Sequence, residues 1–320
     1  MNISEIFLKK QKKILIIGDI MLDQFLCGEA MRISPEAPVP IISGIRISNH
    51  LGGAANVASN LAKWNVDTTI FGLLGNDPKG LEILGMLNAQ SIKFNESCLV
   101  DGRETITKIR VVAGSQHVCR VDFEMNPDKY APTNTQTEKI LSSIPDFDAV
   151  IVSDYAKGFV TEKLMQSIID KCREYNKILC VDPKPRNKIK FRNPYLLKPN
   201  KKEALELADM RSEEIFEYPT DEVCRRIFEK YSPKYLVVTL GEQGMLLANA
   251  DGTKRVFPTK ALSVFDVSGA GDTVISMLAF ALSCGMTIEE AIEAASLAAG
   301  IVVGKAGTSQ AEISEILNAK

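Results

Sequence analysis

Residues 14–19 of the chain read Ile-Leu-Ile-Ile-Gly-Asp, a continuous apolar run that closes on glycine and aspartate. Such a run predicts a strand buried on both faces, as in a parallel sheet. The same signal recurs downstream, separated by stretches with helical periodicity; we expect strands at 149–154, 178–182 and 235–240 and helices at 162–175 and 220–230. Strands that alternate with helices indicate an α/β fold with a doubly wound, mainly parallel sheet flanked by helices.

Three of the four predicted strands end in an aspartate, namely Asp19, Asp154 and Asp182. Ligands of open α/β sheets bind beyond the carboxyl ends of the strands. These side chains therefore predict a binding site along that edge of the sheet.

Two segments, about 20–50 and 103–124, interrupt the alternation. The first is rich in proline, and in the second apolar and polar residues alternate with the period of a strand, as in 105–111. We expect both to form antiparallel strands outside the main sheet, as a small β-sheet lid over the strand ends. Because no repeat or linker divides the chain, we expect residues 1–320 to form a single domain that carries these lid segments.

The composition excludes several functional classes. With 38 basic and 40 acidic residues, the chain lacks the positive charge of proteins that bind nucleic acid or anionic membranes, so we expect a small-molecule partner. The seven cysteines form no Cys-x-x-Cys pair, which favours reduced thiols in the cytoplasm. The two histidines, His50 and His117, belong to no cluster with metal-ligand spacing, and no apolar run is long enough to span a bilayer.

The stretch most informative about chemistry is Asp-Val-Ser-Gly-Ala-Gly-Asp-Thr at 266–273, which leads directly into an apolar helical run. A helix that begins on small residues exposes unpaired backbone N–H groups, which together with the helix dipole suit a phosphoryl group. We therefore expect the amides of Gly269, Ala270 and Gly271 to bind an anion. Asp272 would stay ionised in the field of the helix N-terminus and accept a proton from an attacking hydroxyl. The alternative is an ordinary turn with an aspartate in the first helical turn.

This stretch resembles the C-terminal signature of the ribokinase-like (PfkB) carbohydrate kinases. Residues 51–58, Leu-Gly-Gly-Ala-Ala-Asn-Val-Ala, resemble the N-terminal signature of that family, in which paired glycines let the backbone approach a sugar. By itself, this second stretch also fits a glycine-rich helix start. The resemblance covers essentially the whole chain from residue 14 and implies a ribokinase-like fold. It also implies that sugar hydroxyls are held by Asp19, Asp23, Gly52, Gly53 and Asn56.

Two further stretches resemble the nucleotide-binding motifs of the family. Residues 200–203, Asn-Lys-Lys-Glu, match its Asn-x-x-Glu motif, which implies that Asn200 and Glu203 organise Mg²⁺ through water. An asparagine followed three residues later by glutamate is also a capping box, and the turn at 239–244 also fits a hairpin turn. By resemblance, the residues that contact ATP are Asn200, Lys201, Lys202, Glu203, Thr239, Gly241 and Gly244.

Within the family, four runs resemble the heptose kinases: 18–23, 32–40, 120–124 and 153–158. Those enzymes use ATP to phosphorylate D-glycero-β-D-manno-heptose 7-phosphate at its C1 hydroxyl, on the route to ADP-heptose and the lipopolysaccharide core. Val267 and Ser268 depart from the commoner pattern of the wider family and agree with the heptose kinases. The narrower resemblance adds Arg120, Asp154 and Lys157 to the expected substrate-binding residues.

An acceptor that already carries a phosphate needs cationic donors, because an unpaired dianion in a closed site is costly. The candidates in the sequence are Arg110, Arg120, Lys157 and Lys184. Lys157 stands out because it lies beside a strand-end aspartate and precedes a glycine.

Other functions remain open at this stage. One is a ribokinase-like kinase for a different sugar, sugar phosphate or nucleoside. Another is a catalytically inactive sugar-phosphate sensor, against which the intact Asp272, Asn200 and Glu203 argue. A nicotinamide dehydrogenase is excluded because Gly18 is not followed by the Gly-x-x-Gly that completes its fingerprint.

The resemblance also implies assembly and a metabolic partner. Related kinases often pair through their lids, so we expect a homodimer. Many heptose kinases are fused to a nucleotidyltransferase with a His-x-Gly-His motif, which this sequence lacks. We therefore expect another protein to transfer the adenylyl group.

Overall fold

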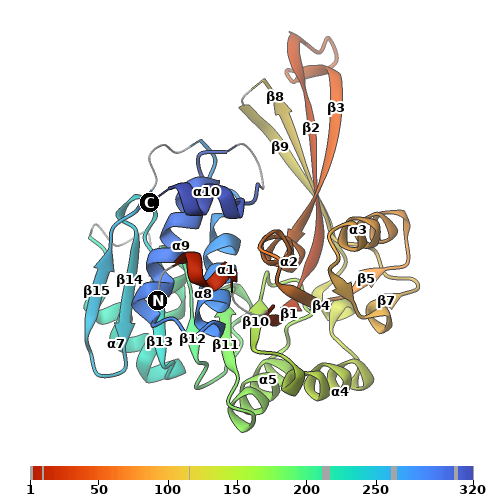
Figure 1. Ribbon diagram of the computed structural model, residues 1–320. Helices are drawn as coiled ribbons and strands as arrows, with labels where there is room; N and C mark the ends of the chain where they lie inside the picture. The colour runs from red at the N-terminus through yellow and green to blue at the C-terminus, as the bar shows by residue number, and fades with distance from the viewer. Residues whose placement is uncertain are drawn as a thin grey trace.

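The computed structural model describes residues 3–8, 11–114, 116–210, 217–260, 265–305 and 309–319. Its centre is a nine-stranded sheet with the order β15-β14-β13-β12-β11-β10-β1-β4-β6 (Figure 1). Strands from β6 to β13 pair in parallel, and β14 and β15 pair antiparallel at one edge. The predicted doubly wound, mainly parallel sheet is confirmed. The strands are β1 (Lys13–Gly18), β4 (Asp67–Phe71), β6 (Lys93–Phe94), β10 (Ala149–Ser153), β11 (Ile178–Asp182), β12 (Leu196–Leu197), β13 (Tyr235–Thr239), β14 (Met245–Asn249) and β15 (Lys254–Phe257).

Helices cover both faces of this sheet because its central strands are apolar on both sides. On β1, Ile14 and Ile16 pack into one core and Leu15 and Ile17 into the other. The first core lies under α1 (Ile3–Leu8), α2 (Ala54–Lys63), α3 (Pro78–Ala89), α8 (Ala270–Ser283), α9 (Ile288–Val302) and α10 (Ile313–Asn318). The second lies under α4 (Asn134–Ser143), α5 (Glu162–Glu174), α6 (Lys201–Leu207) and α7 (Thr220–Tyr231).

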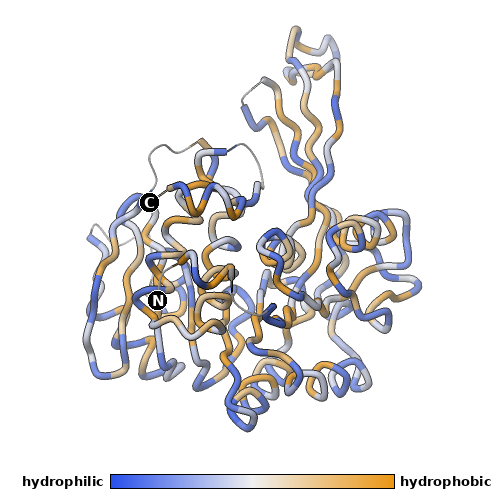
Figure 2. The backbone as a smooth tube through the Cα atoms, viewed as in Figure 1, coloured by the Kyte–Doolittle hydropathy of each residue, from blue (hydrophilic) through white to orange (hydrophobic). Residues whose placement is uncertain are grey.

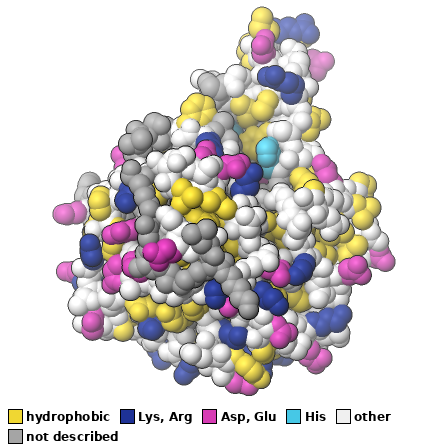
Figure 3. Space-filling view, viewed as in Figure 1, with side chains coloured by type: hydrophobic (Ala, Val, Ile, Leu, Met, Phe, Trp, Pro, Cys, Tyr) yellow, Lys and Arg dark blue, Asp and Glu magenta, His cyan; other side chains and the backbone are white. Residues whose placement is uncertain are grey.

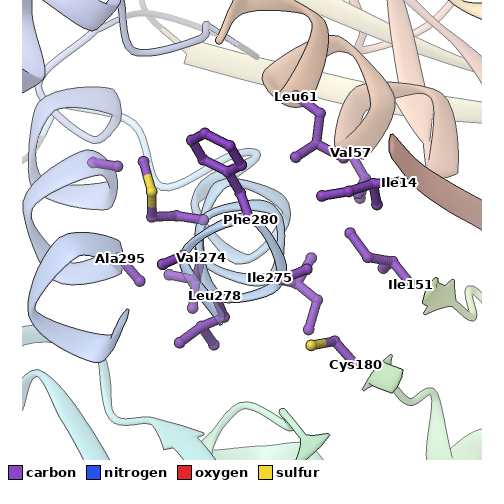
Figure 4. Packing of buried hydrophobic residues seen from close by; sticks show 14 of the residues in the cluster. Ile14, Val57, Leu61, Ile151, Cys180, Val274, Ile275, Leu278, Phe280 and Ala295 are labelled. Atoms are coloured by element: carbon purple, nitrogen blue, oxygen red, sulfur yellow. The ribbon is translucent and has the colours of Figure 1, made fainter. Parts of the chain in front are cut away.

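Helix α8 is buried along almost its whole length. The ring of Phe280 packs against Phe7 of α1 and against Trp64, which follows α2. Figure 4 shows Ile275 directed toward Ile151 and Cys180 of the sheet. In Figure 2, hydrophobic segments lie mainly inside the body and hydrophilic ones mainly on the loops around it. A helix packed on all sides has little freedom to shift, so its N-terminus keeps a fixed position at the edge of the sheet.

A second sheet stands away from this body (Figure 1), and we call it the projecting sheet. Its order is β3-β2-β8-β9, formed by β2 (Ile20–Ile33), β3 (Pro40–Gly53), β8 (Thr107–Ala113) and β9 (Gln116–Phe123). The two expected segments therefore do form strands outside the main sheet. A third, two-stranded sheet pairs β5 (Leu74–Gly75) with β7 (Leu99–Val100).

The projecting sheet differs from the expectation in one pairing. The hairpins β2–β3 and β8–β9 are antiparallel, as predicted, but β2 and β8 pair in parallel. Both of these strands leave the body at the same end, where the amide of Leu22 donates to the carbonyl of Ile106 at 2.9 Å. Parallel pairing follows because the two strands start side by side and run outward together.

Glycine is required where β3 turns into α2. Gly53 has a φ of 59°, and a Cβ there would lie 2.3 Å from the carbonyl oxygen of Asp19. Both conditions exclude other residues without strain. The paired glycines of 51–58 thus hold the base of the projecting sheet against the end of β1.

None of the helices in the described part of the chain combines the length and the hydropathy that crossing a membrane requires.

Candidate active site

The aspartates that end the central strands lie together at one edge of the main sheet. In register, Gly18 of β1 pairs with Ser153 of β10, which pairs with Asp182 of β11. Asp19 and Asp154 follow directly and are 1% and 6% exposed. The aspartates therefore share one edge of the sheet, as the sequence predicted, and the binding of a ligand there stays a prediction.

Asp272 occupies the first turn of α8 at the same edge and is 8% exposed. Its Oδ1 accepts a hydrogen bond from the Tyr155 hydroxyl at 2.6 Å, and its Oδ2 accepts one from Asn56 Nδ2 at 2.7 Å. Residue Gly269, which precedes the helix, has a φ of 80°, and no side chain caps the helix there. The start of α8 thus combines a held carboxylate with amides that no side chain covers.

The electrostatics of Asp272 differ from the sequence-based expectation. Burial raises the pKa of its carboxyl, and the hydrogen bonds from Tyr155 and Asn56 lower that pKa in part. The helix N-terminus was expected to keep this group ionised. The structure shows that its neighbours must offset a desolvation cost first.

Packing of α2 against α8 brings the two signature stretches together. The Thr273 hydroxyl donates to Asn60 Oδ1 at 3.0 Å, and the Ser276 hydroxyl donates to the Val57 carbonyl at 3.1 Å. These buried bonds fix the spacing of the two helices, so Asn56 reaches Asp272 although the two residues are 216 positions apart. An ordinary turn and a glycine-rich helix start describe the local structure of the two stretches correctly. Neither alternative predicts the hydrogen bond between Asn56 and Asp272.

Asp19 organises the loop that follows β10. Its carboxylate accepts bonds from the backbone amides of Tyr155, Lys157 and Phe159 at 2.9, 3.1 and 3.1 Å. Both of its oxygens are therefore engaged inside the protein, and a sugar contact by Asp19 stays a prediction. Because burial and the charge of Asp19 act together, they raise the pKa of Asp154 to about 8.

Asp23 faces the site from the base of the projecting sheet. It is 5% exposed and pairs with Arg110 of β8 at 2.6 Å. A Cβ on Gly52 would lie 2.6 Å from Asp23 Oδ2, so a side chain at this position would clash with the carboxylate. The edge of the body and the projecting sheet together present Asp23, Gly52 and Asn56 near Asp272.

The cations predicted for the acceptor phosphate are each paired with a carboxylate. Arg120 makes a two-pronged contact with Asp122 at 2.8 and 3.0 Å and lies exposed on β9. Lys157 is bonded to Glu124. Lys184 pairs with Glu203 at 2.7 Å, which assigns it to the Asn-x-x-Glu motif rather than to the acceptor side.

The two nucleotide motifs lie side by side. The amide of Thr239 donates to the carbonyl of Pro199 at 3.1 Å, and Thr239 and Asn200 form an isolated parallel bridge. Asn200 and Glu203 do close a capping box on α6, and 241–243 is the turn of the β13–β14 hairpin. Both local alternatives are therefore correct, the two stretches are adjacent, and their contact with a nucleotide stays a prediction.

The remaining predicted nucleotide residues border this place. Gly241 and Gly244 have φ values of 65° and 90°. At Gly244 a Cβ would meet the Phe257 carbonyl oxygen at 2.0 Å, so this glycine is required by packing. Lys201 and Lys202 are exposed at the start of α6.

The sequence did not single out Lys198, which follows β12 and is 2% exposed. Its Nζ pairs with Asp182 Oδ2 at 3.0 Å and would lie 3.4 Å from a Cβ on Gly271. A buried ammonium thus stands beneath the first turn of α8. A lysine at the end of an apolar strand, Tyr195–Lys198, was the available signal.

Direct metal ligands are sparse in this site. Among the described residues, no three His, Cys, Asp or Glu side chains are placed to hold an ion. Glu203 Oε1 accepts from Lys184 and its Oε2 accepts from the Asn200 amide at 2.9 Å. This donor set fits a hydrated Mg²⁺ that arrives with a nucleotide, since Mg²⁺ keeps several waters and uses one or two carboxylates together with phosphates.

Comparison with known protein families identifies the family of the chain. Residues 11–315 match the model of the pfkB family carbohydrate kinases. The chain belongs to this family. The resemblance of the two signatures is thereby confirmed.

Curated relatives and solved structures agree with this membership. This pfkB-family chain is 39% identical over 310 residues to the bifunctional protein HldE of Sulfurimonas denitrificans, a match that covers 95% of the chain and 63% of the relative. The chain thus spans less than two thirds of that relative's length. Its fold is similar to that of Thermotoga maritima ribokinase, with a TM-score of 0.74, 22% identity and coverage of 96% and 99% of the two chains. It is also similar to Arabidopsis thaliana ribokinase complexed with ribose and ATP, with a TM-score of 0.73, 18% identity and coverage of 97% and 99%.

Proposed function

We propose that this pfkB-family chain is an ATP-dependent kinase that phosphorylates the C1 hydroxyl of D-glycero-β-D-manno-heptose 7-phosphate to the 1,7-bisphosphate. The observation that carries the proposal is the meeting of Asp272, at the uncapped start of α8, with Asn56 and Tyr155. The match to relatives named HldE supports the choice of sugar.

In the proposed mechanism, Asp272 is the general base. It accepts the proton of the C1 hydroxyl as the oxygen forms a bond to the γ-phosphorus of ATP. The bond from that phosphorus to the bridging oxygen breaks, and its electron pair leaves on ADP. The amides of Gly269, Ala270 and Gly271 are proposed to donate to the transferring phosphoryl group, because no side chain caps the start of α8. The Ala270 amide would exchange its 3.3 Å bond to the Val267 carbonyl for this contact.

The nucleotide is proposed to lie along Asn200, Glu203 and Thr239, whose backbones the structure places together. Lys201, Lys202, Gly241 and Gly244 border the same place. Asn200 and Glu203 would hold Mg²⁺ through water, and the ion would neutralise part of the charge of the ATP phosphates.

On the acceptor side, Asp23, Asn56 and the backbone at Gly52 and Gly53 are proposed to hold sugar hydroxyls. Asp19 and Asp154 shape the loop beside them through its backbone amides. The projecting sheet is proposed to be the lid of a single domain formed by residues 1–320. Its closure would exclude water, so that ATP phosphorylates the sugar instead of being hydrolysed.

We further propose a homodimer that forms through the projecting sheet, and a cytoplasmic location. The outer face of the sheet exposes Ile47 and Val121, which are 64% and 45% exposed, as a second copy would require. None of the seven cysteines, all within the described residues, forms a disulfide, which fits a reducing compartment.

A coupled assay of ADP release with Mg²⁺ and a panel of sugars and sugar phosphates tests the proposed function. We expect D-glycero-D-manno-heptose 7-phosphate to give the highest kcat/KM, and Asp272→Asn to lower kcat by about 10²–10⁴-fold. A preference for another sugar would overturn the substrate and leave the mechanism. No turnover with any acceptor would favour a sugar-phosphate sensor.

A further inference from the structure

The inner face of the projecting sheet gathers basic side chains opposite the acceptor site. Lys108, Arg110 and Arg120 belong to adjacent rows of β8 and β9 on the face that carries Asp23. Lys157 approaches the same place from the loop after β10, since its charge and those of the two arginines act on Lys108. A phosphorylated acceptor that reaches Asp23 would therefore lie close to these four basic side chains.

Most of these charges are already neutralised. Arg110 pairs with Asp23 at 2.6 Å, Arg120 with Asp122 at 2.8 Å, and Lys157 with Glu124. An arriving dianion would have to displace a carboxylate from each pair. Each of these carboxylates would also repel it, so pairs of this kind attract a phosphate weakly.

Lys108 is the exception. Among the described residues no acidic side chain lies within ion-pair distance of its Nζ, although the side chain is half-buried. The Lys108 ammonium lies over the face of the Tyr155 ring, 5.3 Å from the ring centroid. Burial has the largest effect on the pKa of this ammonium and lowers it, and the charge of Asp23, its register partner on β2, offsets the shift only in part.

Lys108 and the base are linked through Tyr155. The hydroxyl of Tyr155 is bonded to Asp272 and the face of its ring contacts the ammonium, so one side chain borders both the base and Lys108. In a heptose 7-phosphate, the sugar ring and its two exocyclic carbons separate the C1 hydroxyl from the phosphate. An acceptor with its C1 hydroxyl at Asp272 can therefore carry its phosphate toward Lys108.

We propose that Lys108 binds the phosphate that the acceptor already carries, and that it thereby selects sugar phosphates over free sugars. This assignment rests on the proposed function for the identity of the sugar. It replaces the four cations named from the sequence with a residue that forms no ion pair with any described side chain. The same ammonium lies on the lid, so a bound phosphate would also draw the projecting sheet toward the body.

The test compares Lys108→Met with Lys79→Met as a matched control. Lys79 also lies over an aromatic ring of the sheet, with its Nζ 4.4 Å from the centroid of Phe123, but Phe123 belongs to the opposite face from Lys108. For Lys108→Met, we expect the KM of the heptose phosphate to rise about 10- to 100-fold while the KM of ATP stays within twofold. Lys79→Met should change neither value, and Lys108→Arg should recover most of the loss.

A binding measurement keeps the test independent of turnover. In the Asp272→Asn background, we expect Lys108→Met to raise the Kd of the heptose phosphate, measured by calorimetric titration, about 10- to 100-fold. The Kd of the heptose without its phosphate should not change. Equal losses for both sugars, or an unchanged KM for the phosphorylated one, would overturn the assignment.

The two proposals can fail separately. If wild type turns over the heptose phosphate and Lys108→Met binds it normally, the role of Lys108 is wrong and the proposed function stands. If wild type prefers another sugar phosphate and Lys108→Met raises its KM, the substrate is wrong and the role of Lys108 stands. A preference for an unphosphorylated acceptor would overturn both.

Discussion

Tyr155 and Asp272 form the contact on which the proposed chemistry depends most closely. The tyrosine hydroxyl and Asn56 together occupy one lone pair on each oxygen of a buried carboxylate. Each oxygen keeps a second lone pair, so the group can still accept a proton from a substrate. The two donors fix the direction in which the carboxylate points, and Tyr155 is thus a positioning residue in this account.

Replacing Tyr155 by phenylalanine should move the pH dependence of the reaction. Its hydrogen bond lowers the pKa of Asp272, so its loss raises that pKa further and a larger share of the base is protonated at neutral pH. We expect the acidic limb of the kcat profile to move to higher pH and kcat at pH 7 to fall about 10-fold.

The other charged groups that face Asp272 stay in place in this variant. They are Asp23 from β2, Asp182 from β11 and Lys198 after β12. Tyr175→Phe, at an exposed position, is the control for loss of a tyrosine hydroxyl. An acidic limb that stays where it is in wild type, or moves to lower pH, would show that Tyr155 does not tune the base.

At the scale of elements, the loop between β10 and α5 is held from two sides. Asp19 binds three of its amides, and Gly158 fits closely against the body. Gly158 has a φ of 112°, and a Cβ there would lie 2.0 Å from the carbonyl oxygen of Pro127. The loop that carries Tyr155 and Lys157 therefore depends on a residue without a side chain.

Substitution of Gly158 by alanine should destabilise the protein by roughly 1–3 kcal/mol, because it adds backbone strain and a steric overlap. Thermal unfolding of the purified variant measures this effect. Gly85→Ala is the matched control: Gly85 lies inside α3 with open space at its Cβ position, and we expect stabilisation by about 0.5–1 kcal/mol. Equal Tm values for wild type and Gly158→Ala would contradict the geometry of this loop.

Many of the strands, and the edge of the sheet at which their aspartates lie, could be predicted from the sequence. Apolar runs that end in aspartate predicted β1, β10 and β11 and placed Asp19, Asp154 and Asp182 at one edge, because buried parallel strands have a plain signature. The glycines before α8 predicted its open N-terminus. Tyr155 and Lys198 were not predicted as neighbours of the site, since their places depend on the packing of distant elements.

At the scale of the whole molecule, the projecting sheet is a single layer with two unlike faces. The inner face carries Asp23, Lys108 and Arg110, and the outer face carries Ile47 in one row with Leu26 and Val111. Figure 3 shows hydrophobic side chains on the surface of this sheet where it stands clear of the body. The segments of the sheet could be predicted from their period-two pattern. The parallel pairing of β2 with β8 could not, because it depends on where two distant hairpins leave the body.

A charge on the outer face should dissociate the proposed dimer. We expect wild type to sediment as a dimer and the double variant Ile47→Glu with Val121→Glu to sediment as a monomer at the same concentration, because burying two unpaired carboxylates is costly. Val256→Glu, at a residue of β15 that is 53% exposed, is the control and should not change the mass. A wild-type monomer, or a dimer that survives the double substitution, would contradict assembly through this face.

The most direct test of the central claim is to find which oxygen receives the phosphate. We would incubate the protein with ATP, Mg²⁺ and D-glycero-D-manno-heptose 7-phosphate and record the ³¹P NMR spectrum of the product. The account predicts a new phosphorus signal coupled to the proton on C1, beside the unchanged phosphate on C7. A new phosphate on any other carbon, or release of inorganic phosphate with the sugar unchanged, would contradict it.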